Sequence, residues 1–172
     1  MKNQFSDTPN RLVAGVSLSI AFLAVGVMAA WFLGWVWLIQ PVAGAGLMMF
    51  NTALSVALLS LATLALAVKR RYLAAFLAGI PLLISLIALL ESAFSLGIGL
   101  DEFLVDAYVT HPTIPPGRTA PNTALALILA SVSVLLLSTS PFRIRFATAA
   151  QVFSVAAAAL GTAALIGHGL SL

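Results

Sequence analysis

Five long apolar segments constrain the fold of this chain more than any other feature of its sequence. The segments cover residues 12–33, 52–68, 73–90, 123–137 and 146–166. Their lengths approach the roughly 20 residues that a helix needs to cross the hydrocarbon core of a bilayer. They lack the alternation of polar and apolar residues that a membrane β-barrel requires, so we expect each segment to be a helix.

The composition supports a membrane setting for these segments. The chain is 62% hydrophobic and 8% charged, whereas soluble domains carry about 25% charged residues. We therefore predict an all-α integral membrane protein in which residues 1–172 form a single domain of five transmembrane helices, arranged as tandem hairpins. Its lysines and arginines flank the apolar segments and form no basic face, which excludes a nucleic-acid partner.

The distribution of cations predicts the orientation of the segments. If the segments alternate in direction, one side receives every lysine and arginine except Arg118, namely Lys2, Arg11, Lys69, Arg70, Arg71, Arg143 and Arg145. Because cytoplasmic loops are enriched in these residues, we expect the N-terminus in the cytoplasm and the C-terminus outside. The tryptophans near the end of the first segment then fall in the outer headgroup layer, which aromatic rings favour; they are Trp31, Trp35 and Trp37.

A repeated tetrapeptide points to a duplicated building block. Asn-Thr-Ala-Leu occurs at residues 51–54 and 122–125, and each copy opens an apolar segment. We interpret the chain as repeat units over residues 11–68 and 71–140, followed by a half unit over residues 143–172. Five helices leave the last hairpin incomplete. This predicts either a sixth helix after Leu172 or another subunit that covers the exposed face.

Asn51 and Asn122, which begin the two copies, have two interpretations. Asn is a strong N-cap, because its side-chain oxygen accepts a hydrogen bond from a free amide in the first turn of a helix. In the second copy, Pro121 would hold the chain extended just before the helix. Alternatively, the two side-chain amides converge on a ligand near the outer face of the membrane. The sequence leaves both interpretations open.

Glu91 is the most informative ionisable residue, because it follows a long apolar stretch. Acidic groups inside membrane spans are rare and often mark a proton or ligand site, whereas a glutamate that reaches the interface is simply solvated. The long outer loop adds further polar candidates, and the spacing of its carboxylates and histidine matches no metal site. The predicted ligand-binding residues are Glu91, Asp101, His111, Arg118, Asn51 and Asn122.

The last segment contributes two further polar candidates. His168 lies between two glycines, which would allow the close approach of a haem or chlorophyll that the histidine ligates axially. The alternative is that His168 is only a polar helix end. We expect Gln151 to form an interhelical hydrogen bond. The sequence contains no Ser-His-Asp or paired-carboxylate arrangement, so we predict that the protein is not an enzyme, and the sequence identifies no cofactor.

One stretch resembles a known class of membrane region. It reads Pro116-Gly117-Arg118-Thr119-Ala120-Pro121-Asn122-Thr123-Ala124-Leu125, and the preceding loop begins Gly99-Leu100-Asp101. This pattern is similar to the N-terminal integral-membrane sensor regions of bacterial sensor histidine kinases and diguanylate cyclases, and the likeness covers about residues 11–172. The chain departs from the pattern in showing no sixth helix and in having Phe50 where a proline precedes the asparagine.

The resemblance implies a multi-pass protein of the bacterial inner membrane that acts in signal transduction. We expect a sensory module that binds a ligand or senses the membrane at its outer face and passes a conformational signal to cytoplasmic kinase or cyclase domains. The alternative is an accessory or structural subunit of a larger membrane complex, one that could hold a cofactor at His168. The expected partners are the lipid bilayer, the cytoplasmic domains or another membrane subunit, and further copies of the chain in a homo-oligomer.

Overall fold

The structure, a computed structural model, describes residues 8–40, 47–95, 105, 117, 119–139 and 144–169. These residues form helices and connections, with no strand among them. The helices are α1 (Thr8–Leu33), α2 (Val36–Ile39), α3 (Phe50–Ala67), α4 (Arg71–Phe94), α5 (Pro121–Thr139) and α6 (Ile144–Gly169). All except the short α2 are long and apolar enough to cross a membrane. The prediction of an all-α chain with five membrane-length helices is therefore confirmed.

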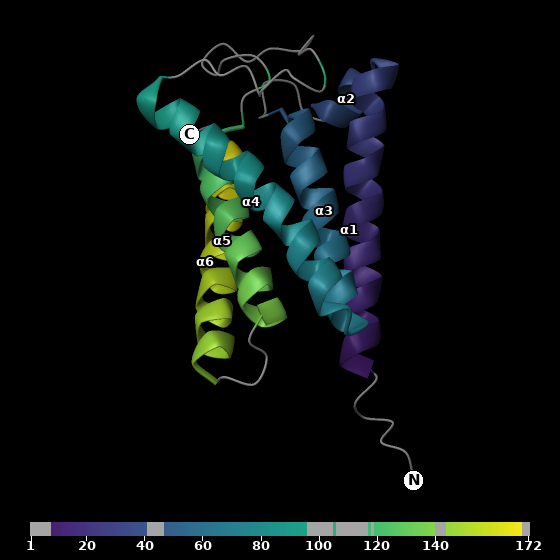
Figure 1. The fold of residues 1–172 in the computed structure, drawn as a ribbon. Helices are drawn as coiled ribbons and strands as arrows, with labels where there is room; N and C mark the ends of the chain where they lie inside the picture. The colour runs from purple at the N-terminus through teal and green to yellow at the C-terminus, as the bar shows by residue number, and fades with distance from the viewer. Residues whose placement is uncertain are drawn as a thin grey trace.

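The long helices pack side by side in a fixed order (Figure 1). Helix α3 lies between α1 on one side and α4 and α5 on the other, and α5 also packs against α6. Among the described helices, α1 contacts only α2 and α3, and α6 contacts only α5. The bundle therefore has a centre of α3, α4 and α5, with α1 and α6 as its two edges.

The described cations gather at one end of this bundle. Arg11 lies in the first turn of α1, Lys69 and Arg70 connect α3 to α4, which Arg71 begins, and Arg145 lies in the first turn of α6. These positions are all at the lower end of the molecule in Figure 1. We call this the basic end, and we call the opposite end, where α4 finishes, the Glu91 end.

A tight turn at the basic end makes α3 and α4 a hairpin. The Arg70 N–H donates to the Ala65 carbonyl at 2.7 Å, and the Lys69 N–H donates to the Leu66 carbonyl at 2.9 Å. These bonds form a Schellman motif that closes α3. The motif requires a left-handed residue, and Lys69 takes that conformation with φ of 63°. Helix α4 then starts immediately at Arg71.

Small side chains form the contacts between the central helices. Ala62 of α3 and Ala78 of α4 are fully buried and pack with Leu127 and Val134 of α5. Large side chains point outward instead, and Phe22 of α1 is 79% exposed. In lipid there is no hydrophobic drive between helices, so small residues that let the backbones approach closely stabilise the bundle.

The Glu91 end has a second apolar cluster, around Trp31. Trp31 is buried, and its Nε1–H donates to the Met48 carbonyl at 3.0 Å. It packs with Ile39 of α2, with Met49 and with Ala53 of α3, so α2 and residues 47–49 are held against the bundle. Trp31 therefore packs inside the protein, whereas Trp35 and Trp37 are exposed, and the placement of the three rings in the headgroup layer stays a prediction.

Candidate functional site

The two Asn-Thr-Ala-Leu segments begin side by side at the Glu91 end. Helix α3 contacts α5, and the hydroxyl oxygens of Thr52 and Thr119 lie 3.1 Å apart. Thr119 is buried just before α5 begins. Gly117, two residues earlier, has a left-handed φ of 71°, which a glycine adopts without strain. The second copy of the repeat is therefore anchored on the first.

Neither asparagine is the N-cap of its helix. Asn51 and Asn122 are each the second residue of a helix, since α3 begins at Phe50 and α5 at Pro121. The capping positions are Met49, which makes no side-chain cap, and Ala120, whose carbonyl accepts the Ala124 N–H at 2.9 Å. The capping interpretation is therefore wrong, because each helix begins one residue before its asparagine. In the second copy a proline occupies the first helical position, which suits it because its φ is already helical and its missing N–H is not needed there.

The two asparagine side chains have different surroundings. Asn51 is buried at 8% exposure and has an interaction partner within the chain. Asn122 is exposed, and its Oδ1 accepts a hydrogen bond from the N–H of Thr123 at 2.9 Å. The fold brings the two helix starts together, but only Asn51 lies inside the bundle.

Glu91 is completely buried, at 0% exposure, near the end of α4. It is the only carboxylate in the described part of the chain, and it has an interaction partner within the chain. Helix α4 continues past it to Phe94 and ends in a left-handed cap at Ser95, whose N–H donates to the Glu91 carbonyl. The interpretation of Glu91 as a solvated interfacial residue is therefore wrong, and the interpretation as an internal polar site remains.

The other sequence-predicted residues are not described in the same detail. Asp101, His111 and Arg118 lie outside the described residues. The backbone of His168 lies in the last turn of α6, and its side chain is outside the description. Among the described residues, no three His, Cys, Asp or Glu side chains come together in a group that could hold a metal ion. Of the described members of the predicted ligand-binding set, Glu91 and Asn51 are buried and Asn122 is exposed.

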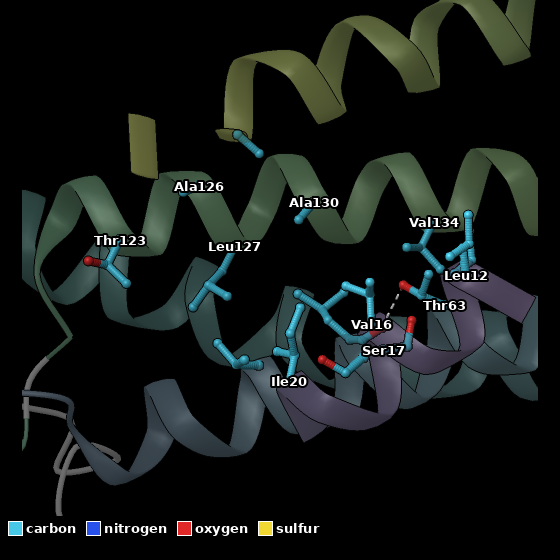
Figure 2. Close-up of a pocket in the computed structure, with 15 residues that line it drawn as sticks. Leu12, Val16, Ser17, Ile20, Thr63, Thr123, Ala126, Leu127, Ala130 and Val134 are labelled. Carbon is cyan, nitrogen blue, oxygen red and sulfur yellow. Dashed lines mark hydrogen bonds between the residues drawn. The ribbon is translucent and has the colours of Figure 1, made fainter. Parts of the chain in front are cut away.

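A groove that the sequence does not predict runs between α1 and α5 (Figure 2). Both helices pack against α3 but not against each other, so α3 forms the floor of a cavity of about 620 Å³. This volume is within the roughly 300–1,000 Å³ of small-molecule sites. Apolar side chains dominate its walls; the lining includes Val16 and Ile20 of α1, Leu59 of α3, and Leu127 and Val134 of α5.

The few polar groups in this groove are hydroxyls. They belong to Ser17, Ser60, Thr63 and Thr123. The Thr63 hydroxyl already donates to the Leu59 carbonyl of its own helix at 2.9 Å (Figure 2). With no charged side chain in its lining, the groove suits an elongated apolar molecule such as a lipid chain. Only the spacing of α1 and α5 creates it, and the sequence carries no signal for that spacing.

The basic end presents a different surface. Lys69, Arg70 and Arg71 are all exposed and line a shallow cavity of about 430 Å³ with Tyr72 and Leu73. The two ends of α4 therefore differ: one has a buried carboxylate and the other has exposed cations.

Comparison of the chain with models of known protein families, with curated proteins and with solved structures finds no match.

Proposed function

We propose that this chain is a membrane-embedded sensory input module of a bacterial inner membrane. The Glu91 end faces the outside and receives the stimulus, and the basic end faces the cytoplasm and delivers the signal. The observation that carries the proposal is the complete burial of Glu91 in a membrane-length helix. Burying an ionisable group in a membrane is costly, and such groups commonly mark functional sites.

Helix α4 provides a direct route from one end to the other. Glu91 and Arg71 belong to the same helix and are separated by 20 residues, or about 30 Å along the axis. Pro81 is buried near the middle of this helix. A proline there removes one backbone hydrogen bond and allows the two halves to bend relative to each other. A change around Glu91 that alters the bend at Pro81 would therefore shift the basic end of α4 relative to its Glu91 end.

A stimulus transmits a signal only if it favours one arrangement of the helices over another. A ligand at the Glu91 end would do so by binding one α4 tilt more tightly. The buried neighbours of this end support such a coupling, because Asn51 lies in the first turn of α3 and Thr119 lies just before α5. The likeness of residues 116–125 to bacterial sensor regions supports the same function.

Spin labels at the basic end test transmission along α4. The chain has no cysteine, so Tyr72→Cys and Arg145→Cys provide two defined and exposed attachment points on α4 and α6. We expect Glu91→Gln to change the distance distribution between the labels. Leu90→Ala, a control that alters an exposed neighbour, leaves it unchanged. Identical distributions in all three proteins would contradict the proposal.

The proposed orientation has its own test. Tyr72 and Phe94 are exposed residues at opposite ends of α4. In intact cells with a permeable outer membrane, a membrane-impermeant maleimide should label Phe94→Cys, and it should label Tyr72→Cys only after the inner membrane is disrupted. The reverse pattern would place the basic end outside, and equal labelling would exclude a spanning α4.

The exposure of α6 favours a second candidate function, an accessory subunit of a larger membrane complex. Among the α6 residues whose side chains are described, Ala150 alone is buried. Purification in a mild detergent distinguishes the candidates. Stoichiometric co-purifying proteins would favour the subunit function, and a visible absorbance band lost in His168→Ala would add a pigment-holding role. Purification without other proteins would leave the sensory module as the supported function.

A further inference from the structure

Gln151 is an exposed amide on a helix that is otherwise suited to lipid. It lies on α6, next to the buried Ala150 that packs on α5. Its side chain makes no hydrogen bond within the described part of the chain. Two hydroxyl side chains of the same helix do have partners within the chain. The Ser154 hydroxyl bonds to Ser133 of α5, and the Thr162 hydroxyl donates to the Ala158 carbonyl of its own helix. The interhelical bond that the sequence predicts for Gln151 is therefore absent between these described helices.

The depth of Gln151 makes this exposure unfavourable in a lone chain. It is six residues from Arg145, or about 9 Å along α6, and a hydrocarbon core is about 30 Å thick. The amide of Gln151 is thus within the apolar layer when Arg145 is at the interface. Lipid chains offer neither a donor nor an acceptor, so the amide gains by meeting another polar group in the membrane.

We propose that α6 is the contact surface between two copies of this chain, with Gln151 of each copy bonded to Gln151 of the other. The contact line continues along one flank of α6 through Val155, Ala158 and Thr162, all of which are exposed. These residues follow Gln151 at intervals of three or four positions, so they share one side of the helix. Ala158 and Thr162 are small enough to let two helices approach closely.

The chemistry of the amide identifies the occupant as a second copy. A side-chain amide contains both a donor and an acceptor, so two of them form a reciprocal pair of hydrogen bonds. Copies in one membrane have the same orientation, and a two-fold axis along the membrane normal places residue 151 opposite residue 151 at the same depth. A different protein would need its own polar group at that depth, whereas a second copy provides it automatically.

Disulfide cross-linking in purified protein tests the proposed surface. Because the chain has no cysteine, Val155→Cys and Ala158→Cys each introduce a single thiol on the proposed flank. Cross-links form only when the Cα atoms lie within about 7 Å. We expect both variants to cross-link in lipid nanodiscs or bicelles. Phe22→Cys on α1 and Phe76→Cys on α4, which are equally lipid-facing, should not.

Replacement of the amide separates specific pairing from random encounter. Gln151→Leu should weaken dimerisation about tenfold, measured as a shift in the dissociation constant by fluorescence transfer on dilution into lipid. Gln151→Asn should retain part of the affinity, and Leu83→Ala, at an exposed position on α4 away from the proposed surface, should leave the affinity unchanged. Unchanged affinity in Gln151→Leu, cross-linking at all positions alike, or cross-linking of α6 only to a different protein in native membranes would overturn the proposal.

Discussion

Ser133 of α5 connects α6 to the rest of the bundle, and its replacement by alanine has a predictable cost. The Ser133 hydroxyl donates to the Ala150 carbonyl of α6 at 2.9 Å. Its oxygen also lies 2.7 Å from the hydroxyl oxygen of Ser154. Since the single Ser133 proton is used on Ala150, the proton between the two serines belongs to Ser154. Ser133→Ala therefore removes two interhelical hydrogen bonds.

The net loss of unfolding free energy is smaller than the loss of two interhelical hydrogen bonds would give. Hydrogen bonds between membrane helices average about 0.6 kcal/mol each, so the removal of both gives about 1.2 kcal/mol. In the variant, however, Ser154 is free to donate to the carbonyl four residues earlier in its own helix. That carbonyl is Ala150, the acceptor that Ser133 has released. We therefore expect Ser133→Ala to lower the free energy of unfolding by about 1 kcal/mol and Ser154→Ala by about 0.5 kcal/mol.

Reversible unfolding in mixed micelles, followed by circular dichroism, measures these changes. The double variant Ser133→Ala with Ser154→Ala should cost about as much as Ser133→Ala alone, because both remove the same serine pair. Thr139→Ala is the control, since its hydroxyl is exposed and bonds only to its own helix. A cost for Ser133→Ala no larger than that of Thr139→Ala, or a double variant that is fully additive, would refute this account of the contact.

Further substitutions test the other contacts by the same unfolding measurement. Glu91→Ala should lower the free energy of unfolding by about 2–3 kcal/mol, because it removes a buried side chain that has an interaction partner; Leu90→Ala, at an exposed position, should cost clearly less. Lys69→Gly should raise stability by up to about 1 kcal/mol, because it relieves the left-handed conformation; Lys69→Ala removes the same charge without this gain, so equal effects would rule out strain. Trp31→Phe should cost about 1–2 kcal/mol, because the Met48 carbonyl loses its donor; an equal loss in the exposed Trp37→Phe control would assign the effect to the ring instead.

The sequence predicts the helices well because membrane spans are recognised from local composition. The five apolar segments correspond to α1, α3, α4, α5 and α6. Boundaries are predicted less well where a turn decides them. Helix α4 extends to Phe94 rather than residue 90, because the left-handed Ser95 ends it. Helix α5 starts at Pro121 rather than after it, because proline favours the first helical position.

The candidate site is less predictable because it depends on how the helices lie beside one another. Glu91 is near the end of its helix, and sequence position alone is compatible with both solvation and burial. Its burial results from the neighbouring structure that covers it. The groove between α1 and α5 has the same origin, since it exists only because both pack on α3 without meeting. No local pattern encodes either relation.

The division between small interior and large exterior side chains determines where this chain can vary. Ala62 and Ala78 lie where α3 and α4 meet α5, and a larger residue at either position would push backbones apart. Phe22 and Leu83 face outward, where one large apolar side chain can replace another. Natural variants should therefore keep the alanines and exchange the phenylalanines and leucines freely, the opposite of the pattern in a water-soluble domain.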